Sequence, residues 1–293
     1  MKPAKFEYLR PSMIKDALQY LEDYGEDAKI ISGGQSLVPV LNMRLSTPKY
    51  LIDVSRIKEL NYIKLDGSVI AIGALTRHYE VEESELISKY CPLLIEGIKN
   101  VGHPQIRSRG TIGGSIAHAD PSAELPCMLS ALRGEIVIIG PDGERTVPTD
   151  EFFLTYLLTS LEPTELVKEI RFPIINENFG SAFIEMTRRH GDFALVEVAA
   201  VVGLDESGNI SSVQLAVGGA GPTPIVLEDI EDFLIGKEPT EHIITEAVGS
   251  IEDYLDPEGD LHSSAEYRVH LASILTKRAL QTAINRVPKG MMA

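Results

Sequence analysis

The sequence predicts an α+β protein of two domains, and three observations lead to this prediction. Its 293 residues allow about two domains. In the first part, short strand-like runs alternate with helical patterns. After a polar break at 176–178, three consecutive strand-like runs precede two helical segments, which is typical of an antiparallel meander followed by helices. We therefore expect one domain over 1–176 and a smaller one over 177–288.

The first part is expected to combine short strands with helices. Ser12 is expected to cap a helix whose apolar residues over 14–21 follow helical spacing. A longer helix is expected over 84–101, broken or kinked at Pro92 because proline has no backbone N–H. The expected strands are 28–31, 50–54, 68–72, 135–139, 145–148 and 166–172. The turn at 140–143 predicts that the two strands beside it form a hairpin.

The second part is expected to form the meander and its helices. The predicted strands are 182–188, 194–204 and 210–217, and the predicted helices are 241–255 and 264–287. Ser263 and Glu266 have the spacing of a capping box at the start of the last helix.

The charge of the chain argues against two classes of partner. With 27 Lys and Arg against 43 Asp and Glu, the formal net charge is −16. A nucleic acid needs a basic face, and an anionic membrane surface attracts basic segments, so neither is expected to bind. The N-terminus lacks the apolar core of a signal peptide, and no apolar run approaches the length of a spanning helix. We expect a cytoplasmic protein with no membrane insertion.

Cys91 and Cys127 are the two cysteines of the sequence. They stand 36 positions apart, so they form no CxxC zinc site, and two cysteines are too few for a four-cysteine iron–sulfur cluster. Both are expected to be small buried hydrophobic residues, and a disulfide is the alternative.

Two glycine segments of similar design are the main candidates for a binding site. Ser32–Ser36 and Thr111–Ser115 each place two glycines between hydroxyl residues. Such backbones can turn with positive φ, approach a ligand closely and direct N–H groups at an anion. Arg107 and Arg109 precede the second segment, in a stretch, 102–126, with few large apolar residues and no core composition. Together they favour a pyrophosphate, hence a dinucleotide; tight structural turns are the alternative. Neither segment is a G-x-G-x-x-G or Walker A motif.

Four polar side chains surround the second segment. Asp120 and Glu124 can accept hydrogen bonds from a ribose or a ring N–H, or they can be first-turn carboxylates of a helix opened by Pro121. His103 and His118 are expected to be loop histidines, because no third residue stands at metal-ligand spacing.

Three motifs give the chain a resemblance to a known family. Residues 31–39 (ISGGQSLVP) resemble the first flavin-binding loop of the medium, FAD-carrying subunit of molybdenum hydroxylases. Residues 105–115 with 119–126 look like its second loop, and 188–194 (RRHGDFA) resemble the family signature Arg-x-x-Gly-Asp-x-Ala. The family includes carbon monoxide dehydrogenase, xanthine dehydrogenase, nicotinate dehydrogenase and quinoline oxidoreductase. The motifs occur in family order over nearly the whole chain.

The resemblance implies the fold and the cofactor site. It implies an FAD domain of the vanillyl-alcohol-oxidase (PCMH) type in two lobes, followed by a small carbon monoxide dehydrogenase flavoprotein C-terminal domain. The FAD-binding residues that it implies are Lys29, Ile30, Ile31, Ser32, Gly33, Gly34, Gln35, Ser36, Leu37, Val101, Thr111, Ile112, Gly113, Gly114, Ser115, Glu124, Val167, Lys168, Asp192 and Phe193. The chain departs from the family at Glu124, where relatives usually have Asp, and at Ile184 and Glu185, near which relatives often have Lys. The resemblance implies no catalytic acid, base or nucleophile and no metal on this chain.

The resemblance also implies a role in a complex. A large molybdopterin-binding subunit would oxidise the substrate, a small subunit with two [2Fe–2S] clusters would relay electrons to this FAD, and NAD⁺, a quinone or O₂ would accept them. The assembly is expected to be a dimer of heterotrimers. Two alternatives are a stand-alone FAD oxidase of the vanillyl-alcohol-oxidase type and a non-catalytic flavin-binding or assembly protein.

Overall fold

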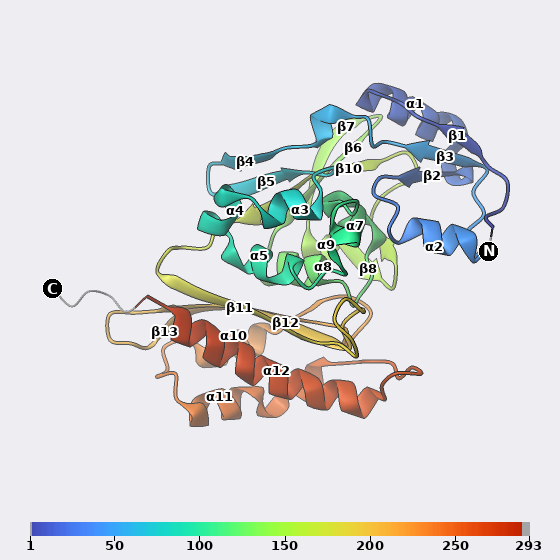
Figure 1. The fold of residues 1–293 in the computed structure, drawn as a ribbon. Helices are drawn as coiled ribbons and strands as arrows, with labels where there is room; N and C mark the ends of the chain where they lie inside the picture. The colour runs from blue at the N-terminus through green and yellow to red at the C-terminus, as the bar shows by residue number, and fades with distance from the viewer. Residues whose placement is uncertain (1, 289–293) are drawn as a thin grey trace.

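The computed structural model describes residues 2–288, and its N-terminal lobe is a small parallel sheet. The strand order is β1 (Glu7–Leu9), β3 (Tyr50–Asp53), β2 (Ala28–Ile31), and helices α1 (Ile14–Tyr24) and α2 (Leu37–Asn42) lie beside it (Figure 1). The prediction that Ser12 caps α1 is wrong. The N-cap is Met13, without a side-chain cap, and the backbone N–H of Ile14 instead donates to Glu59 Oε1 at 3.1 Å.

A second lobe is built on a five-stranded antiparallel sheet. Its order is β4 (Ile63–Asp66), β5 (Val69–Gly73), β10 (Leu166–Pro173), β6 (Glu135–Gly140), β7 (Gly143–Pro148). The predicted hairpin is confirmed as β6–β7. Short helices cover one face (Figure 1): α3 (His78–Glu82), α4 (Glu85–Tyr90), α5 (Pro92–Ile98), α6 (Pro104–Arg107), α7 (Ile112–His118), α8 (Glu124–Ala131) and α9 (Thr149–Phe152). The break expected at Pro92 separates α4 from α5.

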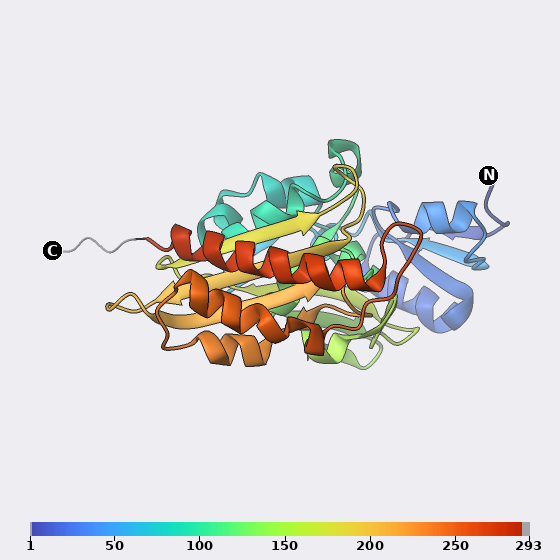
Figure 2. The same ribbon diagram turned by 90° about the horizontal axis from the view of Figure 1, so that it is seen from below.

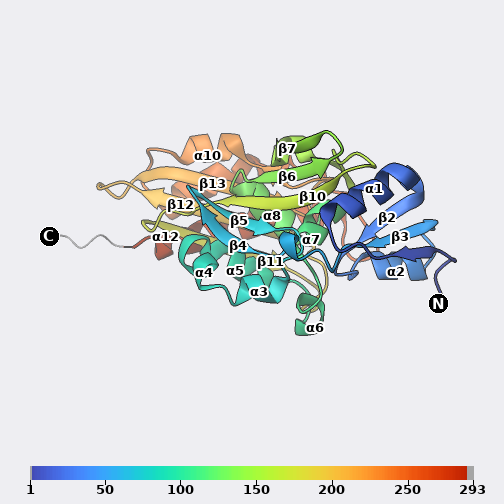
Figure 3. The ribbon, with the colours of Figure 1, turned by 90° about the horizontal axis from the view of Figure 1, so that it is seen from above.

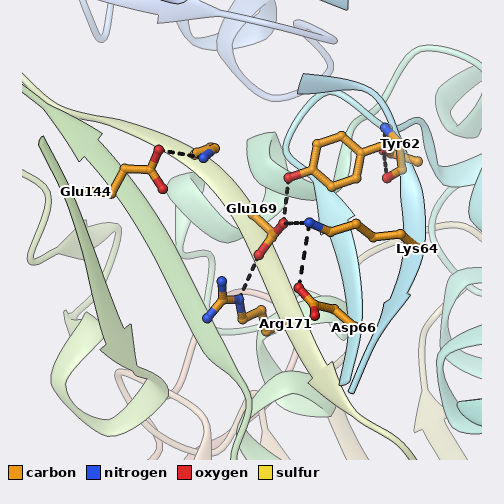
Figure 4. A network of polar contacts seen from close by, with 8 residues as sticks. Tyr62, Lys64, Asp66, Glu144, Glu169 and Arg171 are labelled. Atoms are coloured by element: carbon orange, nitrogen blue, oxygen red, sulfur yellow. Dashed lines mark hydrogen bonds and ion pairs between the residues drawn. The ribbon is translucent and has the colours of Figure 1, made fainter. Parts of the chain in front are cut away.

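The other face of this sheet carries a polar network, and the view from above shows its strands free of covering helices (Figure 3). Glu169 on β10 accepts from Tyr62 Oη at 2.6 Å and from Arg171 Nε at 2.7 Å, and pairs with Lys64 Nζ at 3.3 Å (Figure 4). These partners hold the pKa of the Glu169 carboxyl below its usual value although it is buried. The network joins β4 to β10 across the sheet.

The C-terminal part is the predicted antiparallel meander. Its order is β11 (Phe179–Met186), β12 (Val196–Leu204), β13 (Ile210–Gly218), β14 (Ile225–Val226). One face packs against α10 (Glu228–Leu234), α11 (Glu241–Ala247) and α12 (Ala265–Arg286), and the other faces α5 and α8 of the second lobe (Figures 1 and 2).

Three sequence predictions need correction here. The capping residue of α12 is Ser264, whose hydroxyl accepts from the Tyr267 N–H at 3.2 Å; the Ser263 N–H is already bound to Asp260 Oδ1. The helix expected over 241–255 ends at Ala247 and continues as a 3₁₀ helix over Val248–Tyr254, and α10 had not been predicted. The stretch 102–126 does enter the core.

The stretch 102–126 enters the core through Ile112, Ile116 and Leu125 and through small residues that allow close packing. A Cβ on Gly113 would lie 2.5 Å from the Ala74 Cβ, so glycine lets α7 pack closely on the end of β5. Helix α8, which begins within this stretch, is buried along its whole length between the two sheets. Enclosure on both sides, rather than a run of large side chains, buries this segment.

Residues 2–288 contain neither a membrane-spanning helix nor a metal-ligand cluster. No helix in this range is both long and apolar enough to cross a membrane. Nor do three His, Cys, Asp or Glu side chains in this range gather as metal ligands would.

Candidate functional site

A cavity of about 910 Å³ opens where the N-terminal lobe, the second lobe and the 191–193 loop of the C-terminal part meet. This volume lies near the upper end of the range for small-molecule sites, about 300–1,000 Å³. Of the residues that the resemblance assigns to FAD, all line the cavity except Ile112 and Lys168. The fold therefore gathers four distant segments of sequence around one space.

The two exceptions point away from the cavity. Ile112 is fully buried in the core under α7. Lys168 stands at a β-bulge between Val167 and Glu169, and its side chain extends to the outer face of the sheet, where its Nζ pairs with Glu144 Oε1 at 2.5 Å. Val167, its neighbour on β10, does line the cavity.

The first glycine segment is a loop with unused backbone donors. It follows β2, turns at Gly34 with φ +72°, and leads into α2. Among the described residues, none accepts a hydrogen bond from the backbone N–H groups of 32–36. Gly33 is required for packing, because a Cβ there would collide with the carbonyl oxygen of Arg109. The backbone N–H groups of this cavity-lining loop are therefore unpaired among the described residues. Gly33 packs against the backbone of Arg109 and Gly110, just before the second segment.

The second glycine segment differs, and the expectation of a second turn of the same design is wrong. It is the first turn of α7, capped by Thr111, whose Oγ1 accepts from the Gly114 N–H at 3.2 Å. The N–H groups of Ile112 and Gly113 donate to Thr76 and Ala74 carbonyls at 3.0 and 2.9 Å. A ligand in the cavity can therefore meet hydroxyl groups of this segment and can approach its backbone closely at Gly114. The backbone N–H groups of 112–114 are already in use.

A hydroxyl pair joins the two segments. Ser32 Oγ and Thr111 Oγ1 lie 2.9 Å apart across 79 positions of sequence. A Cβ on Gly114 would lie 2.7 Å from Thr111 Oγ1 and 2.8 Å from Ser32 Oγ, so the space beside this pair depends on glycine.

The basic residues before the second segment do not point to a phosphate. Arg107 Nε pairs with Glu82 Oε2 at 2.8 Å, and its NH1 donates to the carbonyls of Val101 and Gly102, both at 3.3 Å. Arg109 is exposed outside the cavity lining. Arg107 therefore fixes the 99–102 chain, including Val101 in the cavity wall.

Histidines take three different positions. His103 packs its ring near that of His190, with centroids 5.8 Å apart, and a Cβ on Gly191 would lie 2.6 Å from the His103 ring. His118 lines the cavity. His78, which sequence reasoning missed, lines it too: the residue is 4% exposed, and neither ring nitrogen has a hydrogen-bond partner among the described residues.

The environment of His78 keeps its ring neutral. Burial lowers its pKa to about 4, because the charged form would lose its hydration. No motif marked this residue, which stands at the start of a short helix and looks like an ordinary surface histidine in the sequence. Only the packing of α3 against the Gly110 backbone brings it to the cavity wall.

Asp120 and Glu124, the two acidic candidates, have different positions and partners. Asp120 Oδ1 accepts from the Ser122 N–H at 3.0 Å in the turn before α8, whereas Glu124 begins α8 and is 5% exposed. The first-turn alternative thus applies to Glu124, and Pro121 lies before the helix. Burial, with Glu185 and Asp120 nearby, raises the pKa of Glu124 to about 8.

The C-terminal part contributes the cavity mouth. Asp192 and Phe193 line it, and the Phe193 side chain is 58% exposed. Leu157, Leu158 and Leu161, which no sequence argument had selected, also line the cavity. Their segment links β8 (Phe153–Thr155) and β9 (Leu158–Thr159) to β10.

Comparisons with known proteins agree with this architecture. The profile of the FAD-binding domain in molybdopterin dehydrogenase matches residues 4–175, and that of the CO dehydrogenase flavoprotein C-terminal domain matches 181–283. The 6-hydroxypseudooxynicotine dehydrogenase complex subunit alpha of Paenarthrobacter nicotinovorans is 42% identical over 98% of this chain and 97% of its own length.

Two further relatives extend the comparison. The carbon monoxide dehydrogenase medium chain of Hydrogenophaga pseudoflava is 37% identical over 97% of this chain and 98% of its own length, and the solved enzyme from that organism superimposes with a TM-score of 0.95. Quinoline 2-oxidoreductase from Pseudomonas putida 86 gives a TM-score of 0.93 at 33% identity, covering 97% of this chain and 99% of that one. The chain therefore belongs to the FAD-binding subunits of the molybdenum hydroxylase family, of the carbon monoxide dehydrogenase flavoprotein type.

Proposed function

We propose that this chain is the electron-transferring flavoprotein of a molybdopterin-dependent hydroxylase or dehydrogenase complex. In this proposal a small partner subunit delivers electrons from [2Fe–2S] clusters to the FAD on this chain, and NAD⁺, a quinone or O₂ takes them up. A large partner subunit holds the molybdopterin and the substrate. When bound, FAD supplies the redox chemistry, and the protein supplies binding, orientation and electrostatics.

The observation that carries the proposal is the unequal pair of glycine segments in one cavity. Free backbone N–H groups at 32–36 and the Ser32 hydroxyl suit the pyrophosphate of FAD, and the Thr111 and Ser115 hydroxyls of the second segment can donate as well. This donor set fits a dinucleotide, and Lys29 adds a cationic side chain to the cavity lining.

Partners and compartment follow from the cysteines and from the names of relatives. Cys91 and Cys127 are buried free thiols, and two cysteines are too few for a four-cysteine iron–sulfur cluster. Relatives are named a medium chain and a complex subunit. We therefore propose large and small partner subunits, a dimer of heterotrimers and a cytoplasmic location, with the FAD domain over 1–176 and the C-terminal domain over 177–288.

The experiment is co-expression of the chain with large and small subunits, followed by anaerobic addition of the substrate of that complex. We expect bound FAD, visible in the absorption spectrum, that the substrate bleaches only when the small subunit is present. Bleaching without the small subunit would contradict the electron route. Oxidation of an alcohol or aldehyde by the isolated chain with FAD would favour the oxidase alternative, and an assembled complex without flavin would favour the assembly protein.

A further inference from the structure

Two glutamates that no motif includes lie side by side under the cavity. Glu185 on β11 and Glu197 on β12 are direct partners in the antiparallel register, so their Cβ atoms are about 5 Å apart. Glu197 shares its face of β12 with Ala199 and Val201, which pack in the core containing α8, whereas Val198 and Ala200 face α12. Both carboxyls therefore lie between the sheet and α8, whose first residue is Glu124.

The fold makes room for the Glu197 carboxyl. Its partner on β13 is Gly218, and a Cβ there would lie 2.5 Å from Glu197 Oε1. Glu197 is fully buried, and neither of its carboxyl oxygens has a hydrogen-bond partner among the described residues; Glu185 Oε2 is unpartnered too. A buried carboxylate without partners costs several kcal/mol, so such a group keeps its proton.

The charged groups around these carboxyls are of one sign. Those whose fields reach Glu197 are Glu124 at the start of α8, Glu185 on β11 and Asp120 before α8. The other titratable group on α8 is Cys127, a buried thiol whose pKa is raised. The residue of β13 that pairs with Glu197 is Gly218, which carries no charged side chain. Glu96 on α5, which packs against β11, is bound to Arg286 and to the Phe183 N–H. Among residues 2–288, therefore, no cation is placed to neutralise an ionised cluster.

We propose that Glu124, Glu185 and Glu197 form a proton-holding carboxyl cluster that presents Glu124 to the FAD cavity as an uncharged hydrogen-bond donor. This inference rests on the proposed function, because it takes FAD as the occupant of the cavity. It reverses the expectation that Glu124 acts as an acceptor. A carboxylic acid can donate to the phosphate, ribityl or ring oxygens of the cofactor, whereas a carboxylate beside a dianionic pyrophosphate would repel it.

All three carboxyls of the cluster have raised pKa values. Burial raises the pKa of Glu185 to about 7 and that of Glu124 to about 8, and it raises the pKa of Glu197 well above its usual value. Glu124 is therefore protonated at neutral pH and loses its proton as the pH rises past its folded value. Above that pH, FAD binding must include uptake of one proton, and its affinity falls with pH.

The test is the dissociation constant of FAD for the assembled complex, measured from flavin fluorescence between pH 6 and pH 9. For the unmodified complex we expect the constant to rise about tenfold from pH 7 to pH 9, the linkage for one proton with a pKa of about 8. Glu124→Gln, which keeps an uncharged donor at every pH, should remove this rise. Glu185→Gln should move it to lower pH, because the negative charge of Glu185 helps Glu124 keep its proton.

The control is Glu151→Gln, which removes an exposed carboxyl on α9 and should keep the rise unchanged. An equal rise in the unmodified complex and Glu124→Gln would overturn the proposal, as would a constant that does not change with pH in the unmodified complex. If Glu124→Gln fails to assemble, the direction of the Glu185→Gln shift decides. A complex that binds no FAD at any pH contradicts the proposed function instead.

Discussion

Ser32 Oγ and Thr111 Oγ1 meet at 2.9 Å and connect the loop after β2 to the first turn of α7. Thr111 uses the same oxygen to cap α7 through the Gly114 N–H. One hydroxyl therefore sets both the start of the helix and the distance between the two walls of the cavity.

Removing this pair should reveal coupling between the walls. Thr111→Val loses the cap and the link, and we expect a loss of about 1 kcal/mol in the free energy of unfolding, together with weaker FAD binding. Ser32→Ala should cost less, and the double variant should cost less than the sum of the two, because both remove one contact. Denaturant titration and FAD titration measure this, and Thr111→Ser should restore most of both. Strict additivity would show that the two walls are independent.

Gly33→Val should abolish FAD binding for a reason of packing. The new side chain would collide with the Arg109 carbonyl and push the loop away from α7. Gly114→Val should have the same effect, because its side chain would displace the Ser32–Thr111 pair. Flavin content of the purified complex is the measurement. Gly249→Ala is the control, since nothing lies within 4 Å of a Cβ there. Normal flavin content in both valine variants would refute this account of the cavity.

His78 should make the fold sensitive to mild acid. The pKa of His78 is about 4 in the folded chain and lies below its value in the unfolded chain. At a pH between these two pKa values, the unfolded chain binds a proton at His78 and the folded chain does not. The free energy of unfolding should therefore fall as the pH drops below about 6.5, by an amount on the order of 3 kcal/mol when pH 4 is reached. Urea unfolding at several pH values should show a smaller fall in His78→Gln. The same fall in both proteins would assign the acid sensitivity to other groups.

The buried Glu169 carboxylate should contribute more to the free energy of unfolding than the exposed Glu144 carboxylate, which forms a single ion pair. Glu169→Gln leaves the charges of Arg171 and Lys64 without their shared carboxylate, and we expect a loss of about 1–3 kcal/mol. Glu144→Gln breaks the exposed pair with Lys168 and should cost less than about 1 kcal/mol. Because the Glu169 pKa is lowered in the fold, its contribution is present above the unfolded value and is lost as the pH falls through the folded one. Equal losses in the two variants would show that the network adds nothing beyond single pairs.

The sequence alone determined the features that depend on local pattern. The β6–β7 hairpin, the break at Pro92 and the β11–β12–β13 meander follow from turn residues, proline and strand-like runs. The motifs at 31–39, 105–126 and 188–194 determined the family, and nearly all of the residues that the resemblance assigned to FAD line the cavity. These signals are contained in neighbouring residues, so they can be read without a fold.

The tertiary structure decided which groups are free, paired or buried. Two similar glycine segments differ because Ala74 and Thr76 occupy the amides of the second, while those of the first face the cavity. Glu185 and Glu197 are separated in sequence, and only strand register brings them together beneath Glu124. Hydrogen-bond satisfaction and desolvation depend on what packs against a group, and that partner comes from distant parts of the chain. The sequence could therefore identify the site, but the protonation and donor pattern of that site follows from the packing of its three parts.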